Sequence, residues 1–150
     1  MKAAPDVRTV LVSTDFSDYG DAAIAHAVRL AKDYGARLVM VHALDARPTP
    51  NPLYAHYYPI PTPEEVRQAE ATAQEALRAR IPEDLRDSDR TETVVTHGAP
   101  APEILRIAAE RKASLIVIAT HGRTGLLRLA LGSVAERVIR EAPCPVLVVR

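Results

Sequence analysis

Short apolar runs recur along the chain and alternate with segments in which apolar residues return every three or four positions. A continuous apolar run predicts a strand buried on both faces, as in a parallel sheet, and the wider spacing predicts an amphipathic helix. The expected strands are Thr9–Thr14, Leu38–Ala43, Thr91–Thr96, Leu115–Ile118 and Pro145–Val149. The expected helices lie between Ser17 and Gly35, from Glu64 to about Arg80, from a first turn at Pro102, and from Ser133.

Turn and cap residues separate these elements. Ser17 is the predicted N-cap of the first helix, and Gly35 ends that helix because glycine tolerates the left-handed conformation found there. Residues 91–96 alternate only partly, which favours an edge strand. The order of strands and helices predicts one α/β domain over residues 1–150, doubly wound with right-handed crossovers.

The pattern stops between residues 46 and 63. Six of the twelve prolines lie there, together with Tyr54, Tyr57 and Tyr58. A long segment without periodicity inside a compact domain is usually a lid, a binding loop or disordered. We expect a Pro/Tyr-rich loop at about 46–63, and its composition fits a flap over a ligand, a partner contact or a disordered segment.

Composition and charge exclude several classes of protein. Hydrophobic residues make up 47% of the chain and charged residues 25%, which is ordinary for a globular protein. Nineteen basic residues balance nineteen acidic ones, so no net field favours nucleic acid or an anionic membrane. The N-terminus lacks the apolar segment of a signal peptide, and the single cysteine, Cys144, cannot form an internal disulfide. We therefore expect a cytoplasmic protein with neither nucleic-acid nor membrane partners.

Glycines cluster between the fourth strand and the last helix. Gly122, Gly125 and Gly132 are three of the six glycines in the chain, and they lie within eleven residues of one another. Glycine lets the backbone approach a ligand closely, and the first N–H groups of a helix have no partner within it. A strand, a glycine loop and a helix N-terminus in that order predict an anion site, with phosphate the favoured anion.

This loop, together with Asp15 at the end of the first strand, resembles the universal stress protein family over essentially the whole chain. Nucleotide-binding members carry a glycine, two residues, a second glycine, nine residues, and then Gly-Ser or Gly-Thr. Gly122, Gly132 and Ser133 match the second glycine and the closing pair, while Ala119 stands at the first glycine. The sequences of residues 121–125 and 142–147 are also typical of the family.

The resemblance implies a five-stranded parallel sheet of order 3-2-1-4-5 with helices on both faces. It also implies that ATP binds between the first and fourth strands, with Mg²⁺ or Mn²⁺ bridging its phosphates. The C-terminal strand would be an apolar edge, which favours a homodimer through that strand. The implied nucleotide-binding residues are Ser13, Thr14, Asp15, Ala43, Ile118, Ala119, His121, Gly122, Arg123, Gly132, Ser133, Val134 and Ala135.

Each candidate role has a structural alternative. Asp15 matches the acidic residue beside the adenine and ribose, although its carboxylate can equally help to cap the following helix. Ala43 leaves room for a base or is ordinary core. Ser133 is a good N-cap whether or not phosphates bind there. The loop arginines, Arg123 and Arg128, can contact phosphates or simply be solvated.

Catalytic motifs are missing from the sequence. It contains no phosphate-binding loop with an invariant lysine, no dinucleotide fingerprint and no nucleophile elbow. An ATP site without a general base or fixed metal ligands binds well and hydrolyses slowly at most. The favoured hypothesis is a regulatory stress protein that binds an adenine nucleotide. The alternatives are a member in which Ala119 closes the site and which acts through protein partners, and a weak ATP hydrolase.

Overall fold

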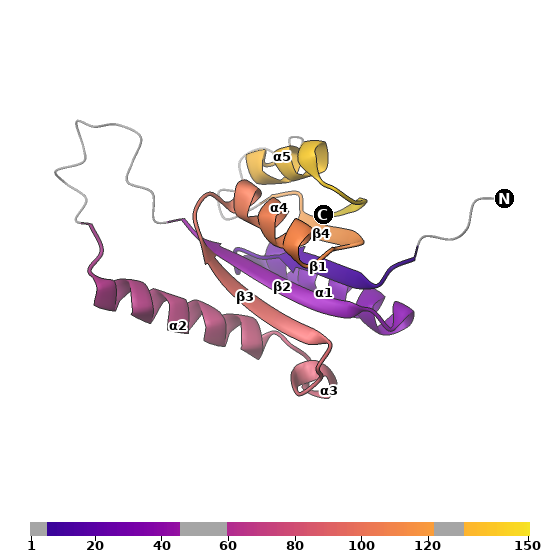
Figure 1. The fold of residues 1–150 in the computed structure, drawn as a ribbon, viewed down its shortest axis with the longest axis horizontal. Helices are drawn as coiled ribbons and strands as arrows, with labels where there is room; N and C mark the ends of the chain where they lie inside the picture. The colour runs from indigo at the N-terminus through magenta and orange to yellow at the C-terminus, as the bar shows by residue number, and fades with distance from the viewer. Residues whose placement is uncertain (1–5, 46–59, 122–130) are drawn as a thin grey trace.

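The computed structural model describes residues 6–45, 60–121 and 131–150, and strands and helices alternate along them as the apolar pattern predicts (Figure 1). The strands are β1 (Thr9–Ser13), β2 (Arg37–Leu44), β3 (Thr91–His97), β4 (Leu115–Ala119) and β5 (Val146–Val149). The helices are α1 (Asp18–Tyr34), α2 (Pro63–Ala79), α3 (Glu83–Arg86), α4 (Pro100–Glu110) and α5 (Ser133–Glu141). The sequence pattern does not predict α3, because four residues are too few to show a helical period.

The strands form one parallel sheet in the order β3-β2-β1-β4-β5, which confirms the expected topology. In this sheet Val12 of β1 lies opposite Met40 of β2 on one side and opposite Val117 of β4 on the other. The strand order reverses at β1, because the chain first builds outward to β3 and then returns to place β4 against the free side of β1. Such a reversal leaves a crevice beyond the carboxyl ends of the two strands.

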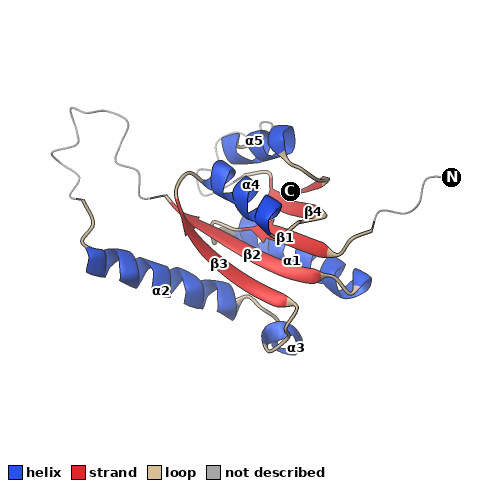
Figure 2. Cartoon of the chain, in the orientation of Figure 1, coloured by secondary structure: helices blue, strands red, loops and turns tan. Residues whose placement is uncertain are grey.

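Helices cover both faces of the sheet, with α1 on one face and α4 and α5 on the other (Figure 2). The side chains of β1 alternate between the two layers. Val10 and Val12 pack in the cluster under α1, and Leu11 packs in the cluster under α4 and α5. All three are fully buried, and each such side chain contributes roughly 1.5–3 kcal/mol. Double-sided burial explains why the central strands contain almost no polar residues.

Local capping fixes the ends of α1 and α2. The Ser17 hydroxyl accepts a hydrogen bond from the Gly20 N–H at 3.2 Å, and Gly35 has a left-handed φ of 61°, so both predicted ends of α1 are confirmed. Thr62 and Glu65 form a capping box at the start of α2, with the Thr62 N–H donating to Glu65 at 2.7 Å. Most of the expected loop at 46–63 lies outside the described residues, and its last residue, Pro63, belongs to α2.

The predicted start of α5 at Ser133 is confirmed, and Pro102 lies in the first turn of α4 as predicted, but the N-cap role predicted for Ser133 is wrong. α4 begins at Pro100, two residues before Pro102, because a proline at the first helical position lacks only an N–H that would have no helical partner anyway. Ser133 is the first residue of α5 and not its N-cap. Gly132 occupies the N-cap position, without a side-chain hydrogen bond.

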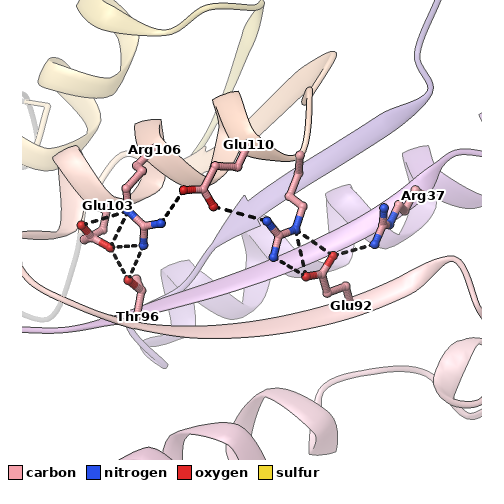
Figure 3. Close-up of polar contacts among 7 residues, drawn as sticks. Arg37, Glu92, Thr96, Glu103, Arg106 and Glu110 are labelled. Carbon is pink, nitrogen blue, oxygen red and sulfur yellow. Dashed lines mark hydrogen bonds and ion pairs between the residues drawn. The ribbon is translucent and has the colours of Figure 1, made fainter.

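A chain of charged side chains runs along β3, between this strand and α4 (Figure 3). Glu92 of β3 accepts hydrogen bonds from Arg37 of β2 at 2.7 Å and from Arg111 at 2.8 Å. Further along β3, Arg106 of α4 donates to Glu103 at 2.6 Å and to Thr96 of β3 at 3.0 Å. β3 is an edge strand, as its partial alternation predicts. These ion pairs and hydrogen bonds fasten the edge strand to β2 and to α4.

We expect Glu92→Gln to destabilise the protein by about 1 kcal/mol at pH 7, in the range of a well-formed partly exposed ion pair. The hydrogen bond from Arg111, together with the charges of Arg111 and Arg37, lowers the pKa of Glu92. Because the folded-state pKa lies below the unfolded value, the stabilisation is present above the ordinary pKa and is lost as the pH falls through the folded one.

Urea unfolding at pH 7 and at pH 3 tests this expectation. The difference in unfolding free energy between wild type and Glu92→Gln should be largest at pH 7 and should shrink at pH 3. Glu75→Gln, at an exposed position on α2, is the control and should change stability little at either pH. A difference that stays constant with pH would contradict the assignment to the ionised carboxylate.

Candidate functional site

A cavity of about 260 Å³ opens where β1 and β4 separate at their carboxyl ends. Its walls come from the ends of β1, β2 and β4 and from the first turns of α1, α4 and α5. This is the switch point of the sheet, where open α/β proteins commonly bind ligands. The fold therefore places a ligand-sized hollow at the position that the strand order predicts.

All the predicted site residues that the structure describes lie around this one cavity. They are Ser13, Thr14, Asp15, Ala43, Ile118, Ala119, His121, Gly132, Ser133, Val134 and Ala135. The other two, Gly122 and Arg123, lie outside the described residues, as does Arg128. Segments far apart in the sequence are thus brought together as expected, and whether they bind a nucleotide stays a prediction.

Further lining residues are absent from the sequence-based prediction. They are Gly20, Val41, His42, Pro100, Ile104 and Thr120. Pro100 and Ile104 come from the first turn and a half of α4, a helix that the sequence pattern does not connect with the site. Val41 and His42 lie on β2 within two residues of the predicted Ala43, and Thr120 follows the predicted Ala119 at the end of β4, so the positions of the strand ends could have indicated them.

The turn between β1 and α1 is held by its own side chains. The Thr14 hydroxyl accepts from the Phe16 N–H at 3.0 Å, and the Thr14 N–H donates to the Val41 carbonyl at 3.0 Å. The Asp15 carboxylate accepts from both the N–H and the hydroxyl of Ser17, at 3.1 and 2.5 Å. Asp15 thus does support the capping residue of α1, and it also lines the cavity. The capping role does not exclude the binding role.

Gly20 allows α1 to lie close against this turn. A Cβ atom built on Gly20 would be 2.6 Å from the Thr14 hydroxyl oxygen and 3.1 Å from a carboxylate oxygen of Asp15. Carbon and oxygen atoms that are not bonded to each other do not approach to 2.6 Å, so either α1 or the turn would have to shift. Only glycine fits at position 20, because any side chain would collide with the Thr14 hydroxyl. As a result, Asp15 lies directly against the first turn of α1.

An aromatic stack lies behind the same turn. Phe16 has a left-handed φ of 64°, which costs a bulky residue of order 1 kcal/mol or more. Its ring stacks on the His42 ring with centroids 4.3 Å apart and an interplanar angle of 29°. The Arg80 guanidinium lies 4.9 Å from the centre of the Phe16 ring, and Arg80 also pairs with Asp21 of α1 at 2.6 Å. The stack therefore joins β2, the turn, α1 and the end of α2.

The opposite wall of the cavity is the N-terminus of α5. The Gly132 N–H donates to the Thr120 carbonyl at 2.8 Å, which ties the start of α5 to the end of β4. A Cβ on Gly132 would lie 3.2 Å from that same carbonyl oxygen, so the approach leaves little room for a side chain. Ser133, Val134 and Ala135 line the cavity. The first N–H groups of a helix carry a partial positive charge that attracts anions.

Ala119 and His121 form the wall at the end of β4. Ala119 lines the cavity and also packs against the core cluster under α1. The His121 ring lies 5.7 Å from the Tyr19 ring of α1, and its Nδ1 atom is 2.9 Å from the Thr120 hydroxyl. Ala119 is therefore part of a wall, and a cavity of about 260 Å³ is open beside it.

Other reactive groups are not assembled into a site within the described residues. No three histidine, cysteine, aspartate or glutamate side chains are grouped there so as to hold a metal ion. Burial raises the pKa of the partly buried Cys144 thiol, which disfavours the reactive thiolate. Across the same ranges, no helix combines the length and the apolar composition needed to cross a membrane.

A doubly wound parallel sheet with a cavity at its switch point defines a class of α/β ligand-binding proteins, and comparison with known proteins narrows that class. Residues 6–150 match the model of the universal stress protein family, so the chain belongs to this family.

Individual relatives agree with this assignment. The chain is similar to universal stress protein MJ0531 of Methanocaldococcus jannaschii, with 38% identity over 95% of this chain and 82% of the relative. Among solved structures it is similar to universal stress protein UspA from Lactobacillus plantarum, with a TM-score of 0.76, 28% identity, and 96% and 98% of the two chains covered. It is also similar to a universal stress protein solved in complex with cAMP, with a TM-score of 0.66, 25% identity, and 97% and 98% coverage.

We expect Gly20→Ala to destabilise the protein by about 1–3 kcal/mol, because the added methyl group overpacks the contact between α1 and the Thr14–Asp15 turn. Thermal or urea unfolding measures the loss. Ala25→Ser, at an exposed position on α1, is the control and should have little effect. A Gly20→Ala variant as stable as wild type would show that the Thr14–Asp15 turn can move to accommodate the methyl group without loss of stability.

Proposed function

We propose that this protein binds an adenine nucleotide, with ATP the favoured ligand, in the cavity between β1 and β4. The observation that carries the proposal is the chemical polarity of the cavity. A carboxylate, Asp15, lies on the β1 side, and the N-terminus of α5 lies on the β4 side. A nucleotide is complementary to this arrangement. Its base and sugar offer hydrogen-bond donors to a carboxylate, and its phosphates are anions that a helix N-terminus attracts.

The β1 side suits the nucleoside. An ionised carboxylate only accepts hydrogen bonds, so Asp15 can bind ribose hydroxyls or an exocyclic amine. Ala43 and Ile118 supply small and apolar walls for a base. The phosphates would then reach Gly132, Ser133 and the N–H groups of Val134 and Ala135 at the start of α5.

A divalent ion fits this arrangement as a bridge between phosphates. Mg²⁺ is usually bound by one or two protein oxygens plus substrate phosphates and water, so a dedicated cage of side chains is not required. The Ser133 hydroxyl at the start of α5 is an oxygen ligand that the cavity offers beside the phosphates, while Asp15 is left to the nucleoside. Bound Mg²⁺ or Mn²⁺ would neutralise phosphate charge that the partial charge of α5 alone does not balance.

A known complex supports the choice of an adenine nucleotide. The similar universal stress protein in complex with cAMP shares 25% of its aligned residues with this chain and covers nearly all of it. Among the described residues that line the cavity there is no lysine to stabilise phosphoryl transfer. We therefore propose a regulatory protein of the stress response that holds its nucleotide and turns it over slowly at most.

The main alternative is a family member that does not bind nucleotides and acts through protein partners. Ala119 favours it, because its methyl group stands where the nucleotide-binding pattern has a glycine. Packing of Ala119 against the cluster under α1 argues for the binding hypothesis instead, since the cavity remains open beside it.

Calorimetric titration of the nucleotide-free protein with ATP plus Mg²⁺, and with AMP, tests the proposal. We expect micromolar ATP affinity and at least a tenfold loss in Gly132→Val, whose side chain would meet the Thr120 carbonyl and displace the start of α5. Ala109→Val, at an exposed position of α4, adds similar bulk away from the cavity and should leave affinity unchanged. No detectable binding at millimolar ATP would favour the partner-binding alternative.

We also propose a homodimer through the β5 edge. Leu147 of β5 and Ile139 of α5 are 37% and 42% exposed, so apolar surface accompanies the unpaired edge of β5. An exposed apolar edge favours pairing with a second copy of the chain.

We expect Leu147→Glu to convert a dimer to a monomer in sedimentation equilibrium at micromolar concentration, because the charge would be buried at the new interface. Tyr34→Glu, at an exposed site on α1, is the matched control and should leave the mass unchanged. A wild-type protein that sediments as a monomer would exclude this dimer.

A further inference from the structure

We propose that His42 and Phe16 are positioning residues that aim the Asp15 carboxylate into the cavity, so that they control binding of the adenosine half of the ligand but not of its phosphates. This inference rests on the proposed nucleotide-binding function and deepens it. Neither His42 nor Phe16 belongs to the glycine-loop pattern of the family, and the sequence pattern alone assigns neither of them a role.

The backbone at Phe16 is the first observation. Among the described residues only Phe16 and Lys112 have a left-handed φ without being glycine, and Lys112 lies in the turn after α4. A large aromatic residue does not adopt this conformation unless its surroundings hold it there. The turn after β1 therefore needs contacts that keep it from relaxing to an ordinary conformation.

His42 supplies those contacts on both sides of Asp15. Its Nδ1 atom lies 2.8 Å from the carbonyl oxygen of Thr14, the residue before Asp15. A carbonyl oxygen only accepts hydrogen bonds, so this nitrogen carries the proton. Its ring stacks on Phe16, the residue after Asp15, at 4.3 Å between centroids. One side chain from β2 thus brackets the residue proposed to bind the nucleoside.

A second group holds the other end of the stack. The Arg80 guanidinium lies over the Phe16 ring, and its hydrogen bond to Asp21 anchors it on α1. With Phe16 held in this way, its N–H reaches the Thr14 hydroxyl, and the carboxylate of Asp15 accepts from Ser17. The orientation of the Asp15 carboxylate therefore depends on His42, Phe16 and Arg80 together.

Loss of the stack should affect the two halves of the site differently. Relaxation of Phe16 rotates the peptide units on either side of it and moves the Asp15 carboxylate, and hydrogen-bond recognition is sensitive to such displacements. The phosphate half is built by α5 and by the Gly132–Thr120 contact, on the other side of the cavity. A purely structural role for His42 would instead weaken all ligands together.

The experiment compares ATP with inorganic tripolyphosphate, each with Mg²⁺, by calorimetric titration. We expect His42→Ala to weaken ATP binding about tenfold and tripolyphosphate binding less than twofold. His42→Asn places an amide donor near the position of Nδ1 and should restore part of the ATP affinity. His26→Ala, at an exposed position on α1, is the control for loss of a histidine and should change neither affinity.

Asp15→Asn tests whether His42 acts through Asp15. Asparagine keeps one acceptor oxygen for Ser17 but replaces the second carboxylate oxygen with a donor, so ATP binding should weaken while tripolyphosphate binding does not. We expect His42→Ala to weaken ATP binding no further in this background, because the two changes remove the same interaction.

Amide hydrogen exchange provides a readout without any ligand. In His42→Ala the Phe16 and Ser17 amides should exchange at least tenfold faster, with the β5 amides unchanged. Equal weakening of ATP and tripolyphosphate, or unchanged exchange at Phe16 and Ser17, would overturn the positioning role. A wild-type protein that does not bind ATP would overturn the proposed function itself and this inference with it, so the two failures are distinguishable.

Discussion

Burial of β1 on both of its faces is the constraint on which the rest of the structure depends. Val10, Leu11 and Val12 have no exposed surface, so one helical layer must cover each side of the sheet. A chain that covers both faces with right-handed crossovers has to build the sheet outward from β1 in two directions. The crevice at the carboxyl end of β1 is thus a by-product of packing a central strand, and the site occupies it.

The two walls of the cavity are stabilised by different interactions. On the β1 side, a turn with an unfavourable backbone conformation is held by the stack of Phe16, His42 and Arg80. On the β4 side, an ordinary helix start is held by one backbone hydrogen bond between Gly132 and Thr120. The first wall depends on side chains, while the second depends on the backbone and on the absence of a side chain at Gly132. Substitutions should therefore perturb the two walls independently.

Features that depend on period and topology could be predicted from the amino-acid sequence. The apolar runs indicate the buried strands because double-sided burial removes polar residues, and the caps at Ser17 and Gly35 reflect local backbone chemistry. The strand ends identify most of the cavity lining, because parallel strands end at the same edge of the sheet. The stack of His42 on Phe16 could not be predicted, because it depends on the φ angle of Phe16 and on a contact between β2 and the turn after β1. The helix α3 could not be predicted either, because four residues are too few to show a helical period.

The two edge strands of the sheet differ chemically, and this difference bears on the proposed dimer. Ion pairs link Glu92 of β3 to Arg37 and Arg111 on the α4 side of the sheet, whereas Leu147 of β5 is an exposed apolar side chain. If the proposed dimer forms through β5, that edge strand is used once in each chain. Two-fold pairing at that edge leaves neither copy of β5 unpaired, so such an assembly closes at two copies and cannot propagate through β5 into a fibre.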